Sequence, residues 1–107
     1  MSVAVFPGSF DPFSVGHYDI AQRALRLFSS LIVAVGVNVE KKGFYTVAER
    51  KANIEQLFAH DARVLVQAYE GLTVDFCKKV GATHIVRGVR GAADFALEHA
   101  VAQANKA

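Results

Sequence analysis

The chain has 107 residues, a net charge of +2 and 52% hydrophobic residues, a composition typical of folded proteins and not of disordered ones. Its length predicts a single domain, residues 1–107, and its charge is too small to predict a nucleic-acid-binding surface. No apolar run is long enough to cross a membrane and the first residues do not resemble a secretory signal, so we expect a cytoplasmic protein. The single cysteine, Cys77, excludes a disulfide framework and is interpreted as a buried helix residue.

Apolar periodicity predicts strands and helices that alternate along the chain. In chain order these are strand 2–6, helix 17–28, strand 31–37, helix 46–60, strand 62–69, helix 72–80, strand 83–88 and helix 92–107. Thr46 and Glu49 have the spacing of a capping box at a helix start, and Gly81 follows the end of the third helix. In the last helix, Leu97, Ala100, Val101 and Ala104 are expected to lie on one face.

This alternation predicts an α/β fold with a parallel sheet, right-handed crossovers and helices on both faces, hence three layers. In such sheets ligands bind beyond the carboxyl ends of the strands, where the strand order reverses. The polar clusters of the chain fall in the four segments expected there, which are 7–17, 38–46, 69–73 and 87–94.

The first of these segments, PGSFDPFSVGH, is typical of a phosphate-binding loop that leads into a helix. Gly8 and Gly16 allow positive φ and close approach of a ligand to the backbone, and Pro7 and Pro12 stiffen the turn. A helix amino terminus attracts phosphate, and His17, in the first helical turn, is placed to donate a hydrogen bond to a phosphate oxygen. We therefore interpret His17 as a functional residue.

The other histidines, His60, His84 and His99, show no such context and are interpreted as incidental. Two common phosphate loops are excluded, because the chain lacks both G-x-x-x-x-G-K-[ST] and a G-x-G-x-x-G after the first strand.

PGSFDPFSVGH instead resembles the signature of the nucleotidylyltransferase superfamily. KKGFYTVAER, LTVDF and IVRGVRGAADFALE follow in the order and spacing of the phosphopantetheine adenylyltransferase family, so the resemblance extends over essentially the whole chain. It implies a Rossmann-like fold and transfer of an adenylyl group from ATP to 4'-phosphopantetheine, assisted by Mg²⁺. The products would be dephospho-coenzyme A and pyrophosphate, formed by direct in-line attack without a covalent intermediate.

The resemblance also implies roles for individual residues around the two phosphates. The Ser9 hydroxyl and the Phe10 backbone N–H would hold phosphate oxygens, and His17 would stabilise the pentacoordinate phosphorus. Lys41 would bring in the phosphate of the acceptor substrate, and Arg87 would hold the same group. His17 and Lys41 are thus two of the three expected catalytic residues.

Arg90 is the third, and with Gly88 and Val89 it would form a turn that contacts ATP. Glu98, on the fourth helix, would contact ATP as well. Thr73 would line the pantetheine channel through its backbone. The implied partners are ATP, 4'-phosphopantetheine and dephospho-coenzyme A or coenzyme A, with no nucleic acid, no membrane and no metal held by the protein itself.

Purely structural interpretations stand beside these roles. Lys41 could be a solvated loop charge, whereas Arg87, ending a buried strand, needs an anionic partner. Glu98 could face water, and Asp94 could be a first-turn residue that suits the helix dipole. Asp11 is interpreted as a side chain that binds the backbone N–H groups of its own turn.

The family continues past the fourth helix into another strand and a segment like ISSS/T-x-x-R/K, which grips the triphosphate, whereas this sequence ends at Ala107. We therefore expect either a piece of a longer protein or a truncated form, with weak or no turnover by itself. Family members assemble as hexamers, and packing between subunits could cover the apolar surface left exposed.

Three other interpretations remain open. The chain could be another nucleotidylyltransferase, acting on nicotinamide mononucleotide or on a phosphorylated alcohol. It could be a non-catalytic module that binds adenine nucleotide or coenzyme A. A flavodoxin-like signalling domain is the third, although that fold would favour an aspartate at a central strand tip.

Overall fold

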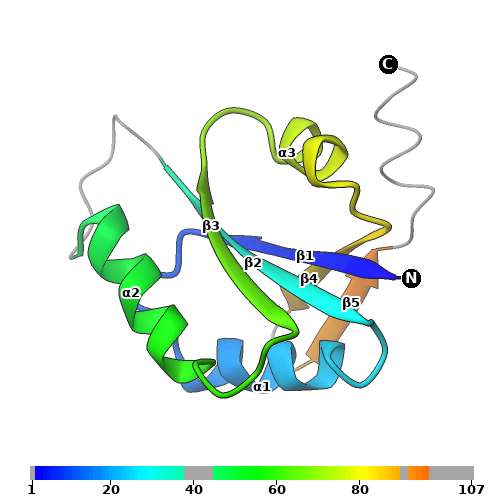
Figure 1. Cartoon of the computed structure of the whole chain (residues 1–107), viewed down its shortest axis with the longest axis horizontal. Coiled ribbons are helices and arrows are strands. Elements are labelled where there is room, and N and C mark those ends of the chain that lie inside the picture. Colours follow the sequence, from blue (N-terminus) through cyan, green and yellow to red (C-terminus); the bar gives the residue numbers. More distant parts are fainter. Residues whose placement is uncertain (1, 38–44, 90–91, 97–107) are drawn as a thin grey trace.

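A computed structural model of the chain describes residues 2–37, 45–89 and 92–96. The four predicted strands and the first three predicted helices are all present (Figure 1). The elements are β1 (Val3–Gly8), α1 (Val15–Ala24), β2 (Ser30–Gly36), α2 (Val47–Leu57), β3 (Val64–Tyr69), α3 (Thr73–Val80), β4 (His84–Val89) and β5 (Ala92–Ala96).

In the described residues the five strands form one sheet in the order β3-β2-β1-β4-β5. The first four pair in parallel, which confirms the predicted parallel α/β fold, and β5 adds to β4 in the antiparallel direction. None of the helices in this described part has the length and apolar character that a membrane-spanning helix requires.

The helix predicted over 92–107 is wrong for its first part. Ala92–Ala96 is strand β5, which pairs with β4 from Val89 opposite Ala92 to Ile85 opposite Ala96. Its alanines favour a helix locally, but pairing with a neighbouring strand overrides so weak a preference. Leu97, Ala100, Val101 and Ala104, predicted on one face of that helix, lie outside the described residues.

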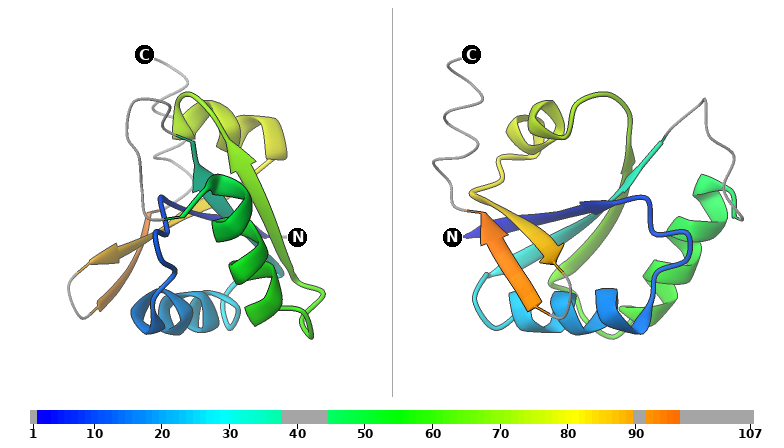
Figure 2. Two further views of the ribbon diagram at one scale, coloured as in Figure 1. Left: turned by 90° about the vertical axis from the view of Figure 1, so that its left-hand side faces the viewer. Right: turned by 180° about the vertical axis from the view of Figure 1, so that it is seen from behind.

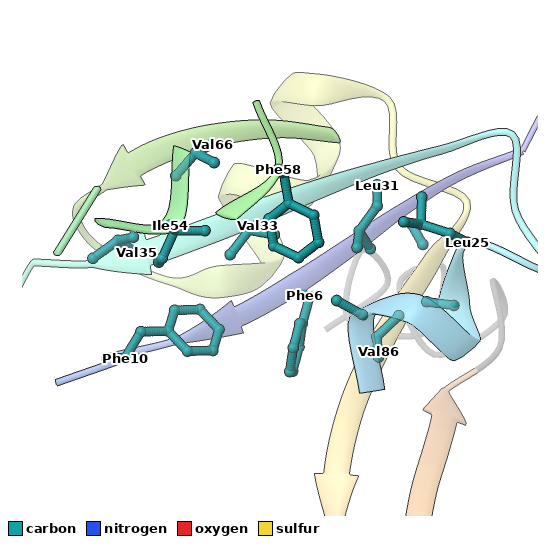
Figure 3. Close-up of a cluster of buried hydrophobic side chains, with 13 residues drawn as sticks. Phe6, Phe10, Leu25, Leu31, Val33, Val35, Ile54, Phe58, Val66 and Val86 are labelled. Atoms are coloured by element: carbon teal, nitrogen blue, oxygen red, sulfur yellow. The ribbon is translucent and has the colours of Figure 1, made fainter. Parts of the chain in front are cut away.

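Helices cover both faces of the sheet, as predicted, and the alternation of side chains along each strand explains why. In β1, Ala4 and Phe6 pack with residues of α1 and α2, while Val5 between them packs against α3. Figure 3 shows the larger cluster, where Ile54 from α2 and Phe58, directly after α2, meet the valines of β2.

Three local predictions are confirmed. Thr46 and Glu49 form the complete capping box at the start of α2. Gly81 ends α3 in the left-handed conformation, with φ 72°. Cys77 is fully buried, and this burial raises the pKa of its thiol.

Helix α1 ends at Ala24, earlier than the predicted Phe28.

Candidate phosphate-binding site

The strand order places a reversal point between β1 and β4. The chain runs from β1 outward to β2 and β3 on one side, then crosses to β4 on the other. β1 pairs with β2 along its whole length, but with β4 only at Ala4 opposite His84 and Val5 opposite Ile85. Beyond these pairs β4 turns away together with β5 (Figure 2). Ligands of open α/β sheets bind at such a point, beyond the carboxyl ends of the strands.

The loop after β1 lies at this reversal point, and Phe10 is the residue in this loop with an unusual backbone conformation. Phe10 has φ 49°, a left-handed conformation that side chains larger than glycine seldom adopt. Phe10 is 3% exposed, and its ring packs between Phe6 and Phe13, with ring centroids 5.1 Å from each. The buried ring therefore anchors the loop to the core.

Gly8 and Gly16 do not use the positive φ that glycine allows, since among the described glycines only Gly71 and Gly81 have it. Gly8 is needed for another reason: a Cβ there would lie 2.8 Å from Cζ of Phe10. At Gly16 a Cβ would meet only Ser14 Oγ, at 3.6 Å. The two glycines thus differ, because one makes room for a core side chain and the other has room for a Cβ at an ordinary contact distance.

His17 occupies the first turn of α1, as predicted, and its ring is held in a defined orientation. The Ser14 backbone N–H donates to His17 Nδ1 at 2.9 Å, and the His17 backbone N–H donates to Ser14 Oγ at 3.2 Å. Nδ1 therefore accepts and carries no proton, so the neutral imidazole carries its proton on Nε2. Ring contacts to Phe10 and Phe13, with centroids 5.0 and 5.4 Å away, fix the ring plane.

The pKa of His17 lies below its ordinary value of 6.5, because partial burial removes water from the charged form. Protonation of Nδ1 would also break its bond to the Ser14 N–H. At neutral pH the residue is thus an uncharged donor through Nε2, for which no acceptor is found among the described residues.

This lowered pKa predicts a pH dependence of stability. Below pH 6.5 the unfolded chain binds a proton at His17 that the folded chain does not. Its contribution to stability is therefore complete above pH 6.5 and is lost as the pH falls through the lowered pKa. His17→Asn should flatten the decline of melting temperature between about pH 7 and pH 5. Circular dichroism melts at several pH values test this, with exposed His60→Asn as the control; equal slopes in all three proteins would contradict it.

Other predicted site residues lie at the same edge of the sheet. Ser9 is exposed in the loop after β1. Thr73 is the first residue of α3, and its hydroxyl forms a hydrogen bond with the Tyr69 hydroxyl at 2.8 Å. The side chain of Arg87 is exposed and not at a buried strand end as expected, so burial does not require an anionic partner for it. Within the described residues, Arg87 has no ion-pair partner.

The structure differs from the prediction in the last part of the site. Gly88 and Val89 are strand residues paired with β5, so the prediction that they form a turn is wrong. Asp94 is in β5, opposite Arg87 in the register, and is not a first-turn helix residue. Lys41, Arg90, Glu98 and His99 lie outside the described residues.

Three features of the site were not predicted. Ser14 is the amino-terminal cap of α1, a role that serine favours, but its partner His17 is not the glutamate or glutamine of the usual capping box. Arg50 donates to the Ser9 carbonyl. The sequence feature that could have indicated this contact is the basic residue in the first turn of a helix, where the helix dipole disfavours positive charge. The Asp11 carboxylate accepts from the Tyr45 backbone N–H at 2.9 Å, which joins the loop to the start of α2.

Comparison with known proteins agrees with this geometry. Residues 5–106 match the family model described as cytidylyltransferase-like, so the fold and loop define a nucleotidyltransferase of that class. Phosphopantetheine adenylyltransferase of Flavobacterium psychrophilum is 49% identical over 106 residues, which are 99% of this chain and 70% of that protein. That of Levilactobacillus brevis is 51% identical over 106 residues, 99% of this chain and 66% of that protein. The chain belongs to the phosphopantetheine adenylyltransferase family.

A solved structure supports the fold alone. The bifunctional NMN adenylyltransferase/ADP ribose pyrophosphatase from Francisella tularensis, complexed with AMP and a manganese ion, matches with a TM-score of 0.55 at 20% identity. The match covers 74% of this chain and 25% of that protein. The Rossmann-like arrangement is thus shared by a protein of low sequence similarity.

Proposed function

We propose that this chain transfers the adenylyl group of ATP to 4'-phosphopantetheine, a step of coenzyme A biosynthesis. A phosphate oxygen of 4'-phosphopantetheine attacks the α-phosphorus of ATP and forms a new P–O bond. The bond from the α-phosphorus to the oxygen bridging it to the β-phosphate breaks, and pyrophosphate leaves. Dephospho-coenzyme A is the other product. Identities of 39–51% to curated family members support this reaction.

The fixed orientation of His17 is the observation that carries the proposal. Phosphoryl chemistry of this kind is accelerated mainly by positioning and by stabilising charge on the phosphorus oxygens. With Nδ1 engaged by the Ser14 N–H, the Nε2–H can donate to an oxygen of the α-phosphate as charge develops there. A neutral donor gives this hydrogen bond at neutral pH and exchanges no proton with the substrate.

The remaining roles rest on the family resemblance and on position. We assign Ser9 Oγ and the Phe10 N–H to phosphate oxygens, since both lie in the loop after β1 at the reversal point. Arg87, exposed on β4, would hold the phosphate of 4'-phosphopantetheine. Lys41 would guide the same group.

Four further residues complete the proposed ATP and pantetheine contacts. Gly88, Val89, Arg90 and Glu98 would contact ATP. Thr73 would contact the pantetheine chain through its backbone, because its hydroxyl is already bonded to Tyr69.

Magnesium would come with the nucleotide. Among the described residues no three histidine, cysteine, aspartate or glutamate side chains lie together in a way that could hold a metal ion. Mg²⁺ is commonly bound through substrate phosphates and water, where it neutralises phosphate charge. A cytoplasmic homohexamer is proposed from the family resemblance as well.

Incubation of the purified chain with ATP, Mg²⁺ and 4'-phosphopantetheine tests the proposal. Slow release of pyrophosphate together with dephospho-coenzyme A, identified by mass, is the expected result, in line with the weak turnover expected from the sequence. Reactions with nicotinamide mononucleotide, or with a phosphorylated alcohol and CTP, serve as controls and should release none. Binding of ATP without release in any reaction would favour a non-catalytic nucleotide-binding module, and release only in a control would favour another nucleotidylyltransferase.

A further inference from the structure

A guanidinium group lies behind the loop that follows β1. Arg50 Nη1 donates to the Ser9 carbonyl oxygen at 2.6 Å, and Arg50 Nε donates to the Thr46 carbonyl oxygen at 3.4 Å. Ser9 and Arg50 are 41 residues apart in sequence, so the first bond is a tertiary contact between the loop and α2. A hydrogen bond from a charged donor at this distance is among the stronger kinds found in proteins.

The position of Arg50 in α2 is unfavourable for a cation. Thr46 caps the helix, so Arg50 lies in its first turn, where the helix dipole presents partial positive charge. The two carbonyl contacts offset this cost. Glu49, beside it, is occupied by the capping box, and its carboxylate accepts from the Thr46 N–H at 3.0 Å. The guanidinium is therefore directed toward the loop and not toward an acidic neighbour on its own helix.

The bond to the Ser9 carbonyl also fixes the next N–H group. The Ser9–Phe10 peptide is trans, so its C=O and N–H point in opposite directions from one plane. With the carbonyl turned toward Arg50, the Phe10 N–H faces away from α2. Within the part of the chain that the structure describes, no acceptor is bonded to this N–H. The Phe10 N–H is thus a backbone donor of fixed orientation that can bind an anionic ligand.

A second link holds the same loop from its other end. The Asp11 carboxylate accepts from the Tyr45 N–H at 2.9 Å, directly before the cap residue of α2. Phe10 lies between the two links, with its ring in the core and φ at 49°. The residues on either side of Phe10 thus both contact the start of α2, Ser9 through its carbonyl and Asp11 through its side chain.

We propose that Arg50 is a positioning residue for nucleotide binding, which orients the Ser9–Phe10 peptide so that the Phe10 N–H meets a phosphate group of ATP. This inference rests on the proposed adenylyl transfer. Arg50 acts through the loop, because its Nη1 donates to the Ser9 carbonyl.

The test compares Arg50→Met, Arg50→Lys and the control Lys51→Met, which removes the same charge from the next position of α2. We expect Arg50→Met to lower kcat/KM for ATP roughly 10- to 100-fold and Lys51→Met to leave it unchanged. Arg50→Lys should lie between, since an ammonium can still donate to the Ser9 carbonyl. In ¹⁵N NMR titrations with ATP, the Phe10 amide should shift strongly in the unsubstituted chain and weakly in Arg50→Met.

Melting temperatures separate positioning from general stabilisation. If Arg50→Met melts lower but keeps the original kcat/KM and Phe10 amide response well below its melting temperature, the inference is wrong and the proposed function stands. If the unsubstituted chain neither binds ATP nor forms dephospho-coenzyme A, the proposed function fails and this inference fails with it.

Discussion

Replacement of His17 by asparagine is expected to lower the rate of dephospho-coenzyme A formation about 100- to 1000-fold with little change in fold. The asparagine Oδ1 lies near the position of Nδ1 and can still accept from the Ser14 N–H, so the start of α1 keeps its cap. The substitution removes the Nε2–H donor. A loss of this size is typical when one donor to a developing phosphoryl or oxyanion charge is removed.

Radiolabelled ATP makes slow rates measurable, so product formation by the unsubstituted chain, His17→Asn and His17→Gln can be compared at equal concentrations. The glutamine amide nitrogen reaches about as far as Nε2, and His17→Gln should therefore recover part of the rate. His60→Asn is the matched control, since His60 is exposed in the loop after α2, at the opposite edge of the sheet. A rate within tenfold of the original for His17→Asn would rule out the proposed donor role.

Most of the fold could be predicted because its elements are encoded locally. Buried parallel strands appear as short apolar runs, and the Thr46 capping box and Gly81 mark helix ends by their own chemistry. β5 could not be predicted in this way. Ala92–Ala96 is a strand only because β4 continues past its pairing with β1 and offers a free edge. The local sequence does not encode that neighbour.

The site could be predicted in its position but only partly in its geometry. His17 could be predicted as a functional residue because its loop, its position at a helix start and its neighbouring residues all indicated phosphate binding. The Arg50 contact spans 41 residues, so no local pattern contains it. Glycine adopts the left-handed conformation most readily, yet in this loop it falls on Phe10, where burial of an aromatic ring offsets the backbone cost. The position of the left-handed residue is therefore decided by a tertiary contact and not by residue type alone.

Gly8→Ala is expected to destabilise the protein by about 1–3 kcal/mol, because the new methyl group would overlap the Phe10 ring. An ideal Cβ at Gly8 lies 2.8 Å from Cζ and 2.9 Å from Cε1 of that ring. The ring cannot move away freely, since Phe6 and Phe13 pack against it with centroids 5.1 Å away. Thermal melts should show a decrease of roughly 5–20 °C.

Gly16→Ala is the matched control within the same segment. Its Cβ would meet Ser14 Oγ at 3.6 Å, an ordinary contact, and alanine favours a helical first turn over glycine. Its melting temperature should therefore stay the same or rise. Phe10→Leu added to Gly8→Ala should restore part of the lost stability, because a smaller side chain relieves the overlap. Equal melting temperatures for Gly8→Ala and Gly16→Ala would show that the ring does not confine position 8. The loop would then owe its shape to the links with α2 rather than to the buried aromatic anchor.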